Sequence, residues 1–161
     1  MKISEIFTSI QGESTFCGLP CTFIRVAGCN LRCKYCDTTY ALEGGEELEL
    51  DQILSRVRDS GISLVELTGG EPLIQDECYL LVNLLLEEGY AVLLETNGDF
   101  DWARKIIDRY RIVEKCKVLV SPVFSKMEAK KLASWIIEER LPVRLQLQLH
   151  KFIWPDMNRG V

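Results

Sequence analysis

The sequence of 161 residues contains one histidine, His150, so a conventional metal site built from several histidines is excluded. No stretch approaches the roughly 20 consecutive apolar residues of a membrane span, and the first residues lack the apolar region of a secretory signal. We therefore expect a cytoplasmic protein without membrane association. Basic residues are too few to favour sequence-independent binding of nucleic acid, since 19 Lys and Arg stand against 24 Asp and Glu, a formal charge of -5. Low-complexity segments and long polar linkers are also absent, which predicts one domain over residues 1–161.

Short β-rich runs alternate with amphipathic helical patterns, as is typical of a parallel α/β protein. The patterns predict strands at residues 2–13, 21–28, 62–70, 90–98, 117–123 and 142–154. They predict helices at residues 48–61, 76–90, 99–115 and 126–141, the first two of which end at Gly61 and Gly89. The motifs described below follow the ends of strands or lie on the first strand, where parallel α/β proteins bind ligands.

Cysteine is abundant, with seven residues, an odd number that in a reducing compartment favours metal binding over disulfides. Cys29, Cys33 and Cys36 have the spacing C-x3-C-x2-C, which suits a soft metal or an iron-sulfur cluster. Three thiolates on a four-iron cluster would leave one iron open to a small molecule. The alternative is a closed zinc site that combines Cys17 and Cys21 with Cys33 and Cys36. Cys78 and Cys116 are expected to be small core residues.

The stretch "CNLRCKYC" at 29–36 resembles the signature of the radical S-adenosylmethionine (SAM) enzymes, whose three cysteines bind a 4Fe-4S cluster. In the same order along the chain, "TGGEP" at 68–72 resembles the glycine-rich segment that contacts SAM, and "ETNG" at 95–98 resembles a second cofactor-contacting turn. Taken alone, both segments are ordinary turns. The resemblance implies a set of SAM-contacting residues: Tyr35, Asp37, Gly69, Gly70, Glu71, Glu95 and Asn97.

Most of the chain resembles the 7-carboxy-7-deazaguanine synthases, through "EIFTSIQGES", "GLPCTFIRVAGCNLRCKYCDTTYA", "LTGGEPL", "SPVFSK" and "LPVRLQLQLHKFIWP". The resemblance implies a partial (β/α) barrel, a homodimer, and the ring contraction of 6-carboxy-5,6,7,8-tetrahydropterin with loss of ammonia. It also implies Mg2+ and an electron donor such as flavodoxin or ferredoxin. Asp99 follows Gly98 directly where the family has a further segment, so we expect the barrel to be shortened after its third core strand.

The expected substrate-binding residues carry chemistry that suits a pterin. The Glu13 carboxylate, with Gln11 beside it, can accept the adjacent ring N–H and amino donors of the ring, unless "SIQGES" is only a polar turn. Arg25 lies in an apolar strand, so its charge is expected to pair either with a substrate carboxylate or with a structural partner. Gln148 and His150 alternate along one face of the last strand, although a lone histidine is more often structural. The resemblance adds Gly12 and Thr68 to this set.

The resemblance further implies that Thr38, in "CDTT", supplies a hydroxyl ligand to Mg2+, with substrate and water completing the coordination. The same residues allow a simpler interpretation, in which Asp37 and Thr39 cap a turn. No side chain is assigned as catalytic, because the radical chemistry belongs to the cofactor.

Three alternatives to a synthase remain open at the level of sequence. A glycyl-radical-enzyme activase shares the cluster spacing but predicts a protein partner and leaves "SIQGES" and "QLHKFIW" unexplained. A non-enzymatic zinc-binding module would be colourless and stable in air. An inactive relative would keep the cluster without forming product.

Overall fold

The computed structural model describes residues 1–34, 36–96, 116–122, 127–149 and 153. These residues form two compact units. The first unit contains residues 1–10 and 19–96 apart from 35, and the second contains residues 11–18, 116–122, 127–149 and 153. None of the helices in these ranges is long and apolar enough to cross a membrane.

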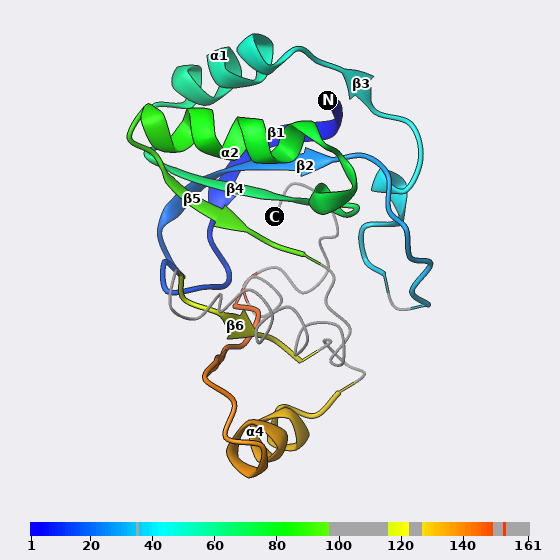
Figure 1. Ribbon diagram of the computed structural model, residues 1–161, viewed down its shortest axis with the longest axis vertical. Helices are drawn as coiled ribbons and strands as arrows, with labels where there is room; N and C mark the ends of the chain where they lie inside the picture. The colour runs from blue at the N-terminus through cyan, green and yellow to red at the C-terminus, as the bar shows by residue number, and fades with distance from the viewer. Residues whose placement is uncertain (35, 97–115, 123–126, 150–152, 154–161) are drawn as a thin grey trace. The chain divides into compact units, whose positions relative to one another are not determined.

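The first unit is built on a five-stranded sheet (Figure 1) with the order β3-β1-β2-β4-β5. Its strands are β1 (Lys2–Ile10), β2 (Pro20–Val26), β3 (Glu46–Glu47), β4 (Leu64–Gly69) and β5 (Ala91–Leu94). β1 is antiparallel to β2 and β3, whereas β2, β4 and β5 run parallel to one another. The predicted parallel α/β architecture is therefore confirmed, with β1 as the arm of a hairpin.

Two helices, α1 (Leu50–Ser60) and α2 (Glu77–Glu87), cover one face of this sheet. α1 begins at a capping box between Glu49 and Gln52 and ends, as predicted, at Gly61, whose φ of 67° is in the left-handed region that favours glycine. The apolar faces of the helices and sheet form the core, which includes Ile3, Ile24, Val26, Ile53, Leu54, Val57, Val65, Leu67, Leu81 and Leu85.

Side chains alternate along each strand, so the residues between the core positions point to the opposite face of the sheet. Several of these residues are polar. Arg25 of β2 and Glu66 and Thr68 of β4 are all buried there. Phe7 and Phe23 stack on the same face, with ring centroids 5.0 Å apart. Buried charges need partners, so this face is suited to a polar site rather than to a second apolar core.

The second unit contains α4 (Ala129–Glu138) and a parallel pair of short strands, β6 (Leu119–Val120) and β7 (Arg144–Leu145). Among the described residues of the predicted strand at 142–154, only Arg144–Leu145 forms a strand, so the prediction was too long at residues 146–149. The predicted helix at 99–115 lies outside the described residues.

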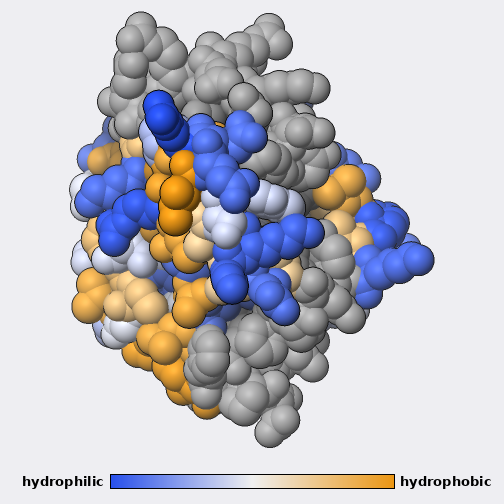
Figure 2. Space-filling view, turned by 90° about the horizontal axis from the view of Figure 1, so that it is seen from below, coloured by the Kyte–Doolittle hydropathy of each residue, from blue (hydrophilic) through white to orange (hydrophobic). Residues whose placement is uncertain are grey.

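Cys78 is buried in α2 as expected, but Cys116 is exposed, so its expected core position was wrong. Several large hydrophobic side chains are exposed, including Ile137 and Leu147, and Figure 2 shows such patches among hydrophilic residues.

Candidate functional site

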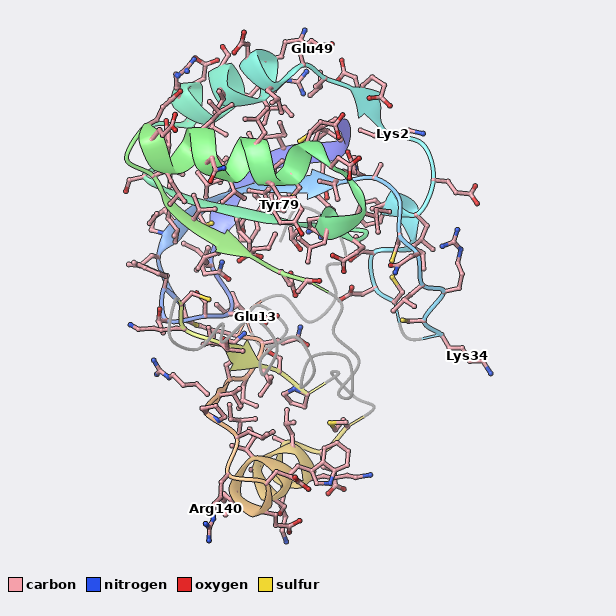
Figure 3. The ribbon with its side chains drawn as sticks, in the orientation of Figure 1. Lys2, Glu13, Lys34, Glu49, Tyr79 and Arg140 are labelled. Atoms are coloured by element: carbon pink, nitrogen blue, oxygen red, sulfur yellow. The ribbon has the colours of Figure 1, made fainter. Side chains whose placement is uncertain are left out.

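The loop that follows β2 carries the three cysteines of the C-x3-C-x2-C motif. Cys29, Cys33 and Cys36 are reduced thiols and partly exposed. A turn closes between the last two, where the Cys36 N–H donates to the Cys33 carbonyl at 3.1 Å. Lys34, at the tip of the loop, points outward (Figure 3). Three accessible thiols in one short loop are the donor set that an iron-sulfur cluster requires.

The sulfur atoms in this loop are not yet gathered around one point. Within the described ranges, no three His, Cys, Asp or Glu side chains are placed so that they could hold a metal ion. The chemistry of the three thiols fits an iron-sulfur cluster, which Cys29, Cys33 and Cys36 would hold. The zinc alternative fits less well, because Cys21 is fully buried near the start of β2 while Cys33 and Cys36 follow its other end.

The base of the cysteine loop contacts the glycine pair Gly69 and Gly70, of which Gly69 ends β4 and Gly70 follows it. The Gly70 N–H donates to the Val26 carbonyl at 3.0 Å, and the Glu71 N–H donates to the Gly28 carbonyl at 2.9 Å. A Cβ at Gly70 would lie 1.8 Å from the Gly28 oxygen. The absence of a side chain at Gly70 therefore lets two backbone segments meet, and this contact fixes the residue that precedes Cys29.

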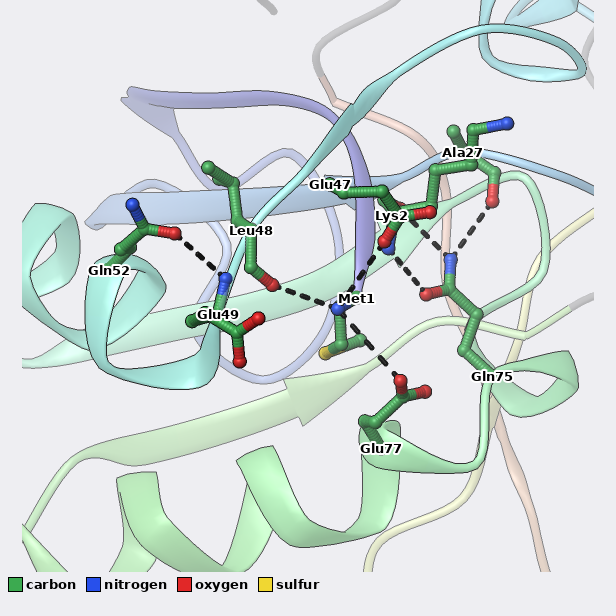
Figure 4. A network of polar contacts seen from close by, with 9 residues as sticks. All are labelled: Met1, Lys2, Ala27, Glu47, Leu48, Glu49, Gln52, Gln75 and Glu77. Carbon is green, nitrogen blue, oxygen red and sulfur yellow. Dashed lines mark hydrogen bonds and ion pairs between the residues drawn. The ribbon is translucent and has the colours of Figure 1, made fainter.

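Gln75, which the sequence analysis did not single out, reinforces the same region (Figure 4). Its amide nitrogen donates to the carbonyls of Lys2 and Ala27, and its amide oxygen accepts from the Lys2 N–H, all at 2.9 Å. The side chain thus ties the start of β1 to the end of β2. In the sequence, the one hint of a structural role for Gln75 is its position directly after "GGEPLI".

Three of the residues expected near the cofactor or substrate, Thr68, Glu71 and Glu95, lie at the carboxyl ends of β4 and β5. The buried Glu71 carboxylate accepts from the Leu73 N–H at 3.0 Å and from the Thr96 hydroxyl at 2.9 Å. The Thr68 hydroxyl donates to Glu95 at 2.6 Å. Burial, with a smaller contribution from the charge of Glu71, raises the pKa of the nearby Cys78 thiol to about 11.

The positions around the proposed magnesium ligand are only partly described. The Thr38 hydroxyl donates to the Asp37 carboxylate at 2.9 Å, and Thr38 precedes a short 3-10 turn at Thr39–Ala41. Tyr35 and Asn97 lie outside the described residues.

Arg25 forms an ion pair on the polar face of the sheet. Its Nε donates to Glu5 at 2.8 Å, and the Tyr40 hydroxyl donates to the same carboxylate oxygen at 2.7 Å. The guanidinium carbon lies 5.4 Å from the centre of the Phe7 ring. The structural partner that the sequence left open is therefore Glu5, and a contact between Arg25 and substrate stays a prediction.

In the second unit, the structure brings together Gln11, Glu13 and Gln148. The Glu13 N–H donates to the Gln11 side chain at 2.8 Å, and Gln148 donates to Oε1 of Glu13 at 2.7 Å. Two residues that the sequence analysis missed, Ser121 and Gln146, donate to Oε2 at 3.0 and 2.7 Å. We refer to Glu13, Ser121, Gln146 and Gln148 as the Glu13 cradle (Glu13 is labelled in Figure 3). Gln146 and Gln148 alternate with leucine in "QLQL", and this pattern could have predicted that both glutamines lie on the same face.

Of two other residues expected near the substrate, Gly12 is among the described residues and His150 is not. The Gly12 carbonyl accepts from the Leu149 N–H at 2.6 Å, so Gly12 joins its loop to the segment that carries Gln148. His150 lies outside the described residues.

Comparisons with known proteins agree with these features. The family model of the radical SAM superfamily matches residues 23–121. A 7-carboxy-7-deazaguanine synthase of Chlorobaculum tepidum is 38% identical over 214 aligned positions that cover 100% of this chain and 97% of the relative. One from Koribacter versatilis is 32% identical and covers 100% of both chains. Both alignments are longer than 161 residues, so the relatives have residues without a counterpart here. The crystal structure of QueE from Escherichia coli shares the fold, with a TM-score of 0.64 at 22% identity over 92% of this chain and 94% of that one.

Proposed function

The chain belongs to the radical SAM superfamily and, within it, to the 7-carboxy-7-deazaguanine synthase family, and we propose from this premise how its residues serve that reaction. It is a lyase that converts 6-carboxy-5,6,7,8-tetrahydropterin to 7-carboxy-7-deazaguanine with release of ammonia, a step toward queuosine and related 7-deazapurines. The observation that carries this conclusion is 38% identity to a synthase over nearly the full length of both chains.

The cofactors of the chain are a 4Fe-4S cluster, SAM and Mg2+. When bound, the cluster and SAM supply the radical that removes hydrogen from the substrate. We propose that Cys29, Cys33 and Cys36 hold the cluster, supported by their spacing and by the contact between Gly28 and Gly70 that fixes the base of their loop. Thr38 is proposed as a ligand of Mg2+, and the proposed SAM contacts are Tyr35, Asp37, Gly69, Gly70, Glu71, Glu95 and Asn97.

The part played by the protein is to bind and orient the pterin. We propose that Glu13 accepts its ring N–H and amino groups, since the donors that the described residues bring to this carboxylate are neutral and leave its charge available. Arg25, already fixed by Glu5, is proposed to attract the substrate carboxylate. The other proposed substrate contacts are Gln11, Gly12, Thr68, Gln148 and His150.

We further propose that the enzyme is a cytoplasmic homodimer that receives its electron from a flavodoxin or ferredoxin. Exposed hydrophobic side chains in the second unit, such as Ile137 and Leu147, support a second copy as the partner. The radical SAM chemistry requires a one-electron donor in any case.

Release of ammonia tests this function. The purified chain is reconstituted anaerobically with iron and sulfide and supplied with reductant, SAM, Mg2+ and 6-carboxytetrahydropterin. We expect ammonia in proportion to substrate, lost in Cys33→Ala and retained in the control Cys116→Ala, whose thiol is exposed and outside the motif. Ammonia from both variants, or from neither variant nor wild type, would contradict the proposal.

A further inference from the structure

The second unit holds the loop of residues 11–18 against residues 146–149 at several points. The backbone joins them through Leu149 and Gly12, and the Gln146 side chain joins them a second time. Its amide oxygen accepts from the Ser14 N–H, while its amide nitrogen donates to Glu13. Ser14 has a φ of 65°, which is uncommon for a residue other than glycine and needs support from its surroundings. Gln146 therefore supports the backbone of the loop and its carboxylate with one side chain.

The two oxygens of Glu13 are held unequally. Oε2 accepts from Ser121 and Gln146, whereas Oε1 accepts from Gln148. An ionised carboxylate offers about two acceptor positions on each oxygen. Counting the donors from the described residues, both acceptor positions of Oε2 are filled, and Oε1 keeps one position for an added donor. The three donors that the described part of the chain brings to this carboxylate are all neutral, so none of them cancels its charge.

We propose that Gln146 is a positioning residue that anchors Oε2 of Glu13, so that Oε1 faces the substrate, and that the substrate displaces Gln148 from Oε1. This inference rests on the proposed function, because a pterin presents two adjacent N–H donors. One donor takes the open position on Oε1, and the departure of Gln148 frees the second. Gln146 and Ser121 stay in place and keep the carboxylate oriented.

The variant Gln146→Glu separates this role from a general effect on folding. It keeps an acceptor for the Ser14 N–H but replaces the donor to Glu13 with a second carboxylate. Two facing carboxylates raise the pKa of one of them, so at low pH the pair shares a proton that restores the hydrogen bond. We expect the midpoint of thermal unfolding to approach that of wild type at low pH and to fall below it as pH rises through the raised pKa.

Ligand binding gives the second readout, measured by the fluorescence of 6-carboxypterin with the full chain. We expect Gln146→Glu to weaken binding roughly 10-fold or more at pH 8, the loss typical of a hydrogen bond to a charged group, with partial recovery at lower pH. In the double variant with Glu13→Gln and Gln146→Glu, the amide at position 13 would donate to the carboxylate at position 146, so the hydrogen bond forms again with donor and acceptor exchanged. It is expected to recover thermal stability but not binding.

Gln52→Glu is the matched control, because the Gln52 side chain accepts from the Glu49 N–H on the surface of α1 and the same substitution leaves this bond intact. It should change neither stability nor binding. Absence of binding by wild type would contradict the pterin assignment itself. Binding by wild type that is unchanged in Gln146→Glu, or a double exchange that recovers no stability, would overturn the role of Gln146 alone.

Discussion

At the scale of single residues, Gly70 has the least space for a side chain among the glycines that the structure describes. A Cβ there would lie 1.8 Å from the carbonyl oxygen of Gly28, and a backbone atom cannot turn away as a side chain can. We expect Gly70→Ala to lower the free energy of unfolding by about 3 kcal/mol, at the upper end for overpacking, and to reduce the iron bound after reconstitution. Urea unfolding and iron analysis measure both effects.

Gly61→Ala is the matched control for this prediction. Its added Cβ meets no atom within 4 Å, but its φ of 67° disfavours alanine by about 1–2 kcal/mol. It should therefore destabilise the protein without affecting iron binding. Equal iron loading in the Gly70→Ala and Gly61→Ala variants would refute a link between the glycine pair and the cysteine loop.

The ion pair between Glu5 and Arg25 is largely buried, with side chains 16% and 11% exposed. Removing one partner leaves a buried charge without compensation, so we expect Glu5→Gln to cost about 3 kcal/mol of unfolding free energy. The exposed pair of Arg56 and Glu46, 3.2 Å apart, is the control, and Glu46→Gln should cost less than about 1 kcal/mol. Denaturant unfolding measures the free energy of unfolding of both variants. Equal decreases in the two variants would contradict the prediction.

The Cys78 thiol should react slowly with alkylating reagents. Its pKa of about 11, raised by burial, reduces the thiolate at pH 8 roughly 100-fold relative to an ordinary thiol near 9. Iodoacetamide labelling followed by mass spectrometry should modify Cys29, Cys33 and Cys36 first in the cluster-free protein. Labelling of Cys78 at a comparable rate would contradict this. The same shift predicts that its contribution to stability is full below pH 9 and declines as pH rises toward 11.

These residues show where sequence reasoning reached its limit. Residue type and pattern singled out Glu13, Arg25 and Gln148, and the structure brings Gln148 to Glu13. The partner of Arg25 was not, because Glu5 reaches it only through the antiparallel pairing of β1 and β2, whose register shifts between Ile3 and Glu5. A shift of one residue would reverse the face on which Glu5 lies.

At the scale of elements, Gln75 adds side-chain hydrogen bonds to the backbone pairing between the start of β1 and the end of β2, where the Ala27 N–H donates to the Lys2 carbonyl at 2.9 Å. Replacing it with leucine would leave the Lys2 N–H and two carbonyl groups without this partner. We expect Gln75→Leu to lower the free energy of unfolding by about 1–3 kcal/mol. Hydrogen exchange should show faster exchange of the Lys2 amide, whereas an unchanged rate would argue against the bridge.

The elements with strong local signals were predicted well, and those that depend on tertiary partners were not. α1 carries its own capping residues and a terminal Gly61, so both of its ends were predictable. The last strand was predicted to span residues 142–154, yet among its described residues only Arg144–Leu145 forms a strand. Beyond it, Gln146 and Gln148 bind Glu13, a distant residue whose presence no local pattern reveals.

At the scale of the whole molecule, the chain carries the two sets of residues that we propose for the reaction. The cysteine loop belongs to the first unit and the Glu13 cradle to the second, each stabilised by its own contacts. The synthases of Chlorobaculum tepidum and Koribacter versatilis have aligned segments without a counterpart in this chain. We propose that the shorter chain still completes the ring contraction.

Detection of the product by mass tests that claim most directly. The anaerobically reconstituted chain is incubated with reductant, SAM, Mg2+ and 6-carboxytetrahydropterin, and the mixture is analysed for 7-carboxy-7-deazaguanine. We predict that the product forms over many turnovers and disappears in Cys33→Ala. A protein that binds its cluster and SAM but forms no product would contradict the account and identify an inactive relative or an enzyme with another substrate.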